Sequence, residues 1–157
     1  MALARNRLLK ELKEASKSAD PNIKLVVSNS NIFSWIAYIR GPQGTPYEGG
    51  IFKLSILCPH SYPIQPPAVY FLTKCFHPNI NFATGELCMD VLKNNWSPAW
   101  TIEYLCNGVI FILSDPNADS PLNCDAGNLI RSGDVIGYRS MARMYTVECA
   151  HTVFPED

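Results

Sequence analysis

Cys88 is the residue of this chain whose sequence surroundings best suit a nucleophile. It follows a glycine-containing loop, and we expect it to be the accessible thiol of the chain, unlike Cys58 and Cys106, which lie inside apolar patterns. His77 and Asn79 precede it in the same stretch. Most single cysteines are small buried hydrophobes, so these polar neighbours decide whether Cys88 has a chemical role.

A cysteine with a histidine and an asparagine nearby is typical of thiol proteases, in which an imidazole deprotonates the sulfur. Those enzymes, however, draw the partners of the cysteine from distant segments of the chain. His77 is also followed by Pro78, which favours a fixed, extended backbone at the histidine. The sequence therefore predicts that His77 and Pro78 shape the loop and that neither is a catalytic base.

Two roles are open to Asn79. Its side-chain NH2 can donate a hydrogen bond to an oxyanion that develops during acyl transfer, an interaction worth on the order of 3 kcal/mol. It can also hold the loop through a local hydrogen bond of the Asx type. The two roles are compatible, because a donor that its own loop holds rigidly is better preorganised.

The composition is that of one globular domain, residues 1–157. Hydrophobic residues make up 47% of the chain, charged residues make up 17%, and the formal net charge is -1, which argues against nucleic acid as a partner. The absence of a long apolar run and of a signal peptide predicts a soluble, cytoplasmic protein. The 6 cysteines lack Cys-x-x-Cys spacing and the 3 histidines do not cluster with them, which predicts reduced thiols and no metal.

The first half of the chain predicts a helix followed by strands. Residues 2–17 place apolar side chains at helical spacing, which indicates an amphipathic helix. Four segments rich in branched and aromatic residues follow, separated by turn-forming residues: 23–27, 32–39, 51–57 and 68–72. Their simplest arrangement is a four-stranded antiparallel meander.

The second half predicts a long loop and then helices. Residues 77–100 are too long for a mere connection, and long ordered loops usually carry function. Residues 101–113 are almost all apolar at helical spacing, which indicates a central buried helix. C-terminal helices are expected over 125–131 and 134–151. Segregated strands and helices define an α+β fold class.

Motifs spread over nearly the whole chain resemble those of ubiquitin-conjugating enzymes. Within the long loop they are His77-Pro78-Asn79, Cys88 and Trp96-Ser97-Pro98. Elsewhere they are Gly41-Pro42, Thr45 to Gly50, Tyr62-Pro63, Pro66-Pro67, Asp115-Pro116-Asn117 and Pro121-Leu122. The predicted order of helix, meander, long loop and helices is also the order of that family.

This resemblance implies that Cys88 accepts the C-terminal carboxyl of ubiquitin as a thioester and passes it to an amine or a thiol. The activating enzyme uses ATP, and this chain itself needs no cofactor. In the family, the residue matching Asn79 supports attack by the amine, and the one matching Ser120 gates access to the cysteine. Asp90 matches an acidic position that helps to place the donor ubiquitin or the amine, although a solvated charge without a role would look the same.

The resemblance also implies partner surfaces. Arg7 and Lys10, on the first helix, match basic positions that contact the activating enzyme, although a solvated helix face would show the same charges. Ile64, with Pro98 and Ala99, is expected to form an apolar patch for a RING-type ligase. Ile64 replaces the aromatic residue of many members and buries less area, which predicts a different set of ligases.

The last third of the chain, from Asp119 to Tyr145, most resembles the peroxisomal members of the family, especially their plant forms. Such enzymes modify the recycling import receptor at the cytosolic face of the peroxisome, where a membrane-anchored peroxin recruits them. The alternatives are general ubiquitin or ubiquitin-like conjugation, a noncatalytic ubiquitin-binding module and a hydrolytic thiol protease.

Overall fold

The sheet predicted from the sequence is confirmed. The structure is a computed structural model that describes residues 2–18, 20–28, 30–88, 90, 92 and 94–156. Its strands form one antiparallel sheet in the order β1-β2-β3-β4. The elements of the described residues are α1 (Ala2–Ala15), β1 (Ile23–Ser28), β2 (Asn31–Arg40), β3 (Ile51–Leu57), β4 (Ala68–Phe71), α3 (Ile102–Ser114), α4 (Cys124–Arg131) and α5 (Val135–Cys149).

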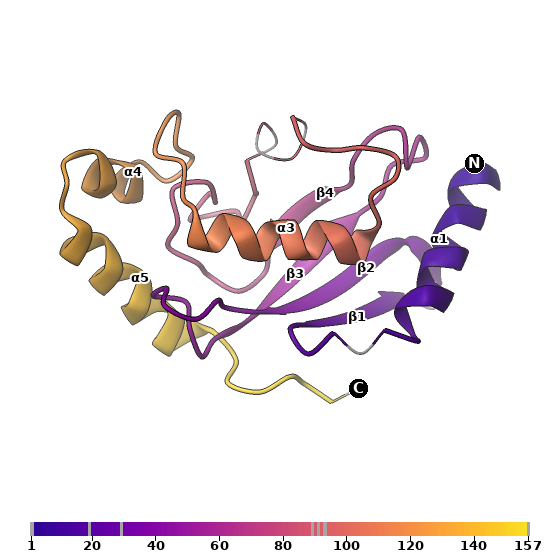
Figure 1. Ribbon diagram of the computed structural model, residues 1–157, viewed down its shortest axis with the longest axis horizontal. Coiled ribbons are helices and arrows are strands. Elements are labelled where there is room, and N and C mark those ends of the chain that lie inside the picture. The colour runs from indigo at the N-terminus through magenta and orange to yellow at the C-terminus, as the bar shows by residue number, and fades with distance from the viewer. Residues whose placement is uncertain are drawn as a thin grey trace.

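The helices surround the sheet from three sides. Figure 1 shows α3 running across the sheet, α1 at one end of the molecule, and α4 and α5 at the other. Trp35 of β2 is fully buried, and its indole N–H donates to the carbonyl of Ile32 at 2.7 Å. Leu8 of α1 and Ala142 of α5 are fully buried as well, so one core holds both ends of the chain.

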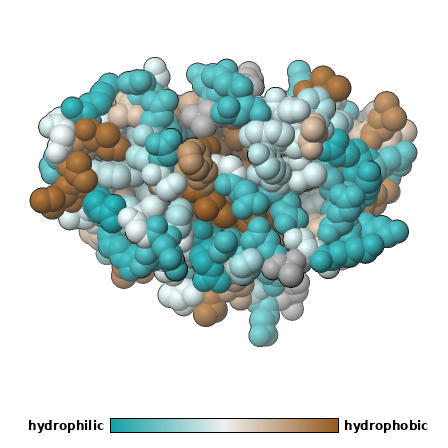
Figure 2. Space-filling model, in the orientation of Figure 1, coloured by the Kyte–Doolittle hydropathy of each residue, from teal (hydrophilic) through white to brown (hydrophobic). Residues whose placement is uncertain are grey.

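The central helix α3 lies in the middle of the domain, as predicted, with one face buried and one exposed. Its inner face is buried, but Tyr104 and Phe111 on its outer face are 56% and 64% exposed. Figure 2 shows apolar side chains reaching the surface over α3. Periodicity does not reveal this exposed stripe, because it cannot tell an apolar surface stripe from a core stripe when nearly every position is apolar. The exposed stripe borders the cleft described below.

The segment that leads to Cys88 folds back as a small hairpin beside β4. The N–H of Asn81 donates to the carbonyl of Glu86 at 2.9 Å, and that of Gly85 donates to the carbonyl of Asn81 at 2.8 Å. The N–H of Phe71 in β4 donates to the carbonyl of Gly85 at 2.7 Å. Residues 79–88 are therefore ordered, and positions 89, 91 and 93 of the predicted long loop lie outside the described residues.

Gly85 should be irreplaceable in this hairpin. Its φ is +79°, and a Cβ there would lie 1.9 Å from the carbonyl oxygen of Phe71. We expect Gly85→Ala to lower the free energy of unfolding by at least about 3 kcal/mol and to raise the rate at which Cys88 reacts with a thiol reagent. Urea unfolding and thiol titration measure the two effects.

Gly44→Ala is the matched control for this substitution. Gly44 has the same φ of +79°, but no atom lies within 4 Å of the position that a Cβ would take there. Its variant therefore isolates the conformational cost of about 1 kcal/mol. Equal losses for the two variants would show that the contact with β4 is unimportant.

Candidate active site

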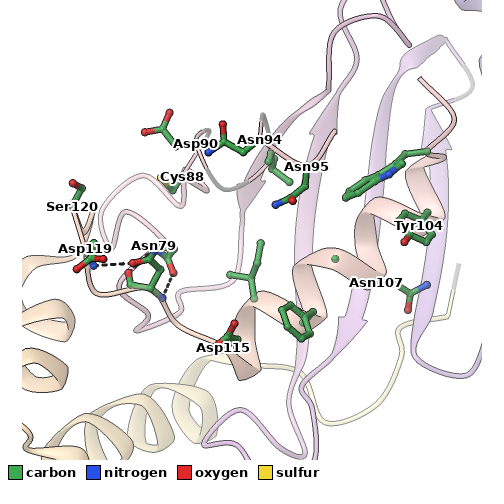
Figure 3. Close-up of a pocket in the computed structure, with 16 residues that line it drawn as sticks. Asn79, Cys88, Asp90, Asn94, Asn95, Tyr104, Asn107, Asp115, Asp119 and Ser120 are labelled. Atoms are coloured by element: carbon green, nitrogen blue, oxygen red, sulfur yellow. Dashed lines mark hydrogen bonds between the residues drawn. The ribbon is translucent and has the colours of Figure 1, made fainter. Parts of the chain in front are cut away.

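A cleft with a volume of about 840 Å³ opens beside Cys88. The thiol and Asp90 lie on one side, the exposed face of α3 lies along the cleft, and Asp119 and Ser120 lie near the thiol (Figure 3). The structure thus brings together the four predicted catalytic residues, since Asn79 lines the same cleft. It also adds residues that the sequence reasoning missed, namely Tyr104, Asn107, Asp115 and Asn117.

Cys88 itself is half-buried and held by its main chain. Its N–H donates to the carbonyl of Asn79 at 2.8 Å. Cys58 and Cys106 are buried, as predicted, but Cys124 and Cys149 are exposed, so the expectation that Cys88 is the accessible thiol of the chain was wrong. The exposed pair lie at the start of α4 and the end of α5, where only tertiary packing decides which side chains are covered. What distinguishes Cys88 is its cleft.

His77 is a buried structural residue, as predicted. Its Nε2 donates to the carbonyl of Ile112 at 2.8 Å, and its Nδ1 accepts from the N–H of Asn79 at 3.0 Å. Both bonds require the neutral imidazole, and burial lowers the pKa of His77 from 6.5 to about 4, partly opposed by the bond to Ile112. With both ring nitrogens engaged, His77 is not available as a base for Cys88, which removes the reason for a thiol protease interpretation.

The side chain of Asn79 joins the two loops that border the thiol. Its Nδ2 donates to the carbonyl of Asn117 at 2.9 Å, and its Oδ1 accepts from the N–H of Asn117 at 2.9 Å. Figure 3 shows Asn79 between the loop of Cys88 and the loop of Asp119 and Ser120. The side chain is almost fully buried, so the loop-holding role predicted for Asn79 is present. The motif Asp115-Pro116-Asn117 contained the signal for its partner.

Ser120 lies in a loop that is hydrogen-bonded to the segment 78–79 on both sides of the serine. Asn117 is tied to Asn79, and the N–H groups of Leu122 and Asn123 both donate to the carbonyl of Pro78, at 2.8 Å and 3.2 Å. Ser120 has a φ of +53°, a conformation that costs a serine roughly 1–2 kcal/mol. Its hydroxyl is exposed at the cleft, so the surrounding contacts impose its position.

Carboxylates are the charged groups among the described residues of the cleft. Asp90, Asp115 and Asp119 are exposed residues of its wall, and no lysine, arginine or histidine occurs among the described residues that line it. An approaching ammonium group is therefore attracted, whereas an anion is repelled. Among the described residues, no three His, Cys, Asp or Glu side chains are placed to hold a metal ion.

The residues predicted for ligase binding lie on two linked loops, and those predicted to contact the activating enzyme lie on α1. Ile64 is 71% exposed, and Pro98 and Ala99 are exposed too. The indole N–H of Trp96 donates to the carbonyl of Pro63 at 2.9 Å, so the two loops that carry this apolar patch are linked. Lys10 on α1 is exposed, whereas Arg7 is 24% exposed and hydrogen-bonded within the chain.

Comparison with known proteins assigns the family. The model of the family described as "Ubiquitin-conjugating enzyme" matches residues 7–146, so the chain belongs to the ubiquitin-conjugating enzyme family. Protein PEROXIN-4 of Arabidopsis thaliana is 57% identical over 148 residues, which cover 93% of this chain and 94% of that protein. Ubiquitin-conjugating enzyme E2 pex4 of Dictyostelium discoideum is 53% identical over 141 residues, covering 89% and 95%.

Solved structures agree with this assignment. A ubiquitin conjugating enzyme from Plasmodium yoelii superposes with a TM-score of 0.85 at 40% identity, covering 94% of this chain and 95% of that one. An E2 domain from Toxoplasma gondii gives a TM-score of 0.83 at 35% identity, covering 94% and 99%. The chain is thus a ubiquitin-conjugating transferase with the family's general partners, which are ubiquitin, an activating enzyme and a ligase. No helix in the described part is long and apolar enough to cross a bilayer.

Acid should destabilise the fold through His77, because protonation of Nδ1 must break its hydrogen bond with Asn79. The pKa is about 4 in the folded chain and 6.5 ordinarily, so the unfolded chain takes up the proton first as the pH falls. The contribution of His77 is fully present above pH 6.5, and up to about 3 kcal/mol should be lost between pH 6.5 and 4. Urea unfolding at a series of pH values measures this loss.

The His77→Gln variant should be less stable at neutral pH and should lack this component of the pH dependence. His151→Gln replaces an exposed histidine and should retain it. If wild type and His77→Gln lost stability in parallel over this range, the acid sensitivity would come from other groups.

Proposed function

We propose that Cys88 is the residue that carries ubiquitin. Its sulfur, as the thiolate, attacks the thioester carbonyl on the activating enzyme, a new C–S bond forms, and the thiol of the activating enzyme leaves. An amine or a second thiol then attacks the same carbonyl, the bond to Cys88 breaks, and the attacking group releases its proton to solvent. The observation that carries the proposal is the position of this half-buried thiol in a cleft without a histidine.

The absence of a histidine among the described lining residues fits this chemistry. Exchange between thioesters trades equivalent bonds and needs a thiolate, while aminolysis of a thioester needs mainly positioning and oxyanion stabilisation. Hydrolysis would instead need a base to activate water. No ATP site is required, because the activating enzyme consumes the nucleotide.

Asn79 serves this reaction through the rigidity of its loop and through its amide. Its NH2 carries two N–H bonds, and one of them is donated to Asn117. The other remains available to an oxyanion that forms on the Cys88 thioester. Because the side chain is held at both of its polar atoms, it reorganises little when charge develops.

Ser120 gates the approach of the amine, and Asp90, Asp115 and Asp119 attract it. A neutral hydroxyl at position 120 orients an ammonium group less than a carboxylate does, and phosphorylation would add negative charge there. Rates of thioester discharge to free lysine should rise in Ser120→Asp relative to wild type and Ser120→Ala. Equal discharge rates for the three proteins would show that residue 120 does not control the approach of the amine.

The names of the two relatives support a narrower setting. Both carry the name of the fourth peroxin, and each is aligned with this chain over most of its length. The chain acts at the cytosolic face of the peroxisome, where a membrane-anchored peroxin recruits it, and it modifies the recycling import receptor with the help of a RING-type ligase. Lys10 meets the activating enzyme, while Ile64, Pro98 and Ala99 meet the ligase.

Incubation with activating enzyme, ATP and ubiquitin should yield an adduct that a reducing agent removes, because the link is a thioester. Cys88→Ser should instead give an oxyester that survives the reducing agent and is cleaved by hydroxide. Non-reducing gel electrophoresis measures both species. Cys124→Ser, which removes a more exposed thiol, should form the thioester like wild type. Loss of the adduct in Cys124→Ser, with a reducible adduct retained in Cys88→Ser, would refute the assignment to Cys88.

Cells that carry Cys88→Ala in place of the wild-type chain should retain the import receptor on the peroxisomal membrane, because its modification and release stop. Membrane fractionation and import of a fluorescent peroxisomal cargo measure the defect. Cys124→Ser should support normal import. Normal receptor release with Cys88→Ala would refute the role in receptor recycling and leave general ubiquitin or ubiquitin-like conjugation as the function.

A further inference from the structure

A buried ion pair on α1 reaches the start of α3. Glu11 is only 4% exposed, and its Oε2 accepts from Nε of Arg7, one helical turn earlier, at 3.0 Å. Its Oε1 accepts from the N–H of Ile102, the first residue of α3, at 2.7 Å. The phenolic O–H of Tyr62 also donates to Oε2. A buried carboxylate is costly unless its oxygens are paired and hydrogen-bonded, and this one has three donors.

All three nitrogens of the Arg7 guanidinium donate hydrogen bonds within the chain. Besides the bond from Nε to Glu11, Nη1 donates to the carbonyl of Pro98 at 2.8 Å and Nη2 donates to the carbonyl of Trp100 at 2.5 Å. The group also lies over the ring of Tyr62, 5.7 Å from the centroid. A planar fork can serve three acceptors in one plane, which a lysine ammonium cannot reproduce.

The loop that Arg7 holds connects the predicted ligase patch with the cleft. Pro98 belongs to the patch, and Trp100 lines the cleft and packs edge-on against Tyr104 of α3 at a centroid distance of 4.7 Å. Residues 96–100 belong to no helix or strand, so no helix or sheet pairing holds the carbonyl groups of Pro98 and Trp100. Arg7 donates to both of these carbonyl groups, and Glu11 orients Arg7.

We infer that Arg7 and Glu11 are positioning residues for the response to the ligase, because they fix the loop 96–100 between the ligase patch and the cleft of Cys88. This inference rests on the proposed function, which places the ligase on that patch. It also revises the contact with the activating enzyme that the family resemblance implies for Arg7. The guanidinium of Arg7 donates to acceptors of its own chain, whereas Lys10 on the same helix is exposed.

Glu11→Gln provides the central test, because a side chain that is 4% exposed cannot contact a ligase directly. The glutamine keeps an acceptor for Ile102 but places an NH2 group against the donors of Arg7 and Tyr62. With pre-charged enzyme and a RING domain chosen because it accelerates discharge of the wild-type thioester, the half-saturating RING concentration should rise at least about fivefold. Rates are expressed relative to discharge of the same variant without the RING domain.

Arg7→Lys separates positioning from simple charge. If Arg7 acts through its fork, the lysine variant should fail like Arg7→Ala, and the amide resonances of residues 96–102 and the indole N–H of Trp96 should shift in the free enzyme. Lys13→Ala, which removes an exposed charge of the same helix, should keep the wild-type RING response and the wild-type spectrum.

Two results would overturn the inference. One is a wild-type RING response in Glu11→Gln, and the other is recovery of the response in Arg7→Lys, which would make Arg7 a charge contact. Charging of each protein by the activating enzyme is recorded on the same samples. If wild type itself failed to form a reducible adduct, the proposed function would be wrong, whereas normal charging with an unchanged RING response refutes only the positioning role.

Discussion

The side chain of Asn79 makes two hydrogen bonds with the main chain of Asn117, and this pair joins the loops on either side of Cys88. Neither loop has regular secondary structure, so side chains and main-chain contacts between loops must satisfy their polar groups. The main-chain carbonyl of Asn79 in turn accepts from the N–H of Cys88. Asn79 therefore helps to fix both the position of Cys88 and the position of the loop that carries Ser120.

His77 anchors this arrangement in the core. Its imidazole bridges the main chain of Asn79 and the last turn of α3, through the carbonyl of Ile112. A neutral imidazole with both nitrogens used cannot shuttle protons, so the residue that looks most like a catalytic base is a structural support. The site is consequently built to hold an acyl group in place. The charges that the described residues place around it are carboxylates.

The same principle extends to the far end of the cleft. There Arg7 and Glu11 of α1 satisfy carbonyl and amide groups of the loop before α3, just as His77 does at the end of that helix. Both termini of α3 are thus tied to loops, one that leads into the hairpin of Cys88 and one that carries Pro98 of the exposed apolar patch. The helix forms a rigid link between these surfaces, and its exposed stripe borders the cleft between them.

The sequence by itself determined the α+β order and the meander, because apolar periodicity is a local property of the chain. Its resemblance to a family singled out Cys88, Asn79 and Ser120 as candidate site residues. The sequence could not determine which cysteines are exposed, which face of α3 is covered, or that Arg7 points inward. Asn117 and Glu11 lie 38 and 91 residues from the partners that their bonds reach. Only the tertiary structure brings such groups together, since hydrogen-bond partners and burial depend on packing between distant segments.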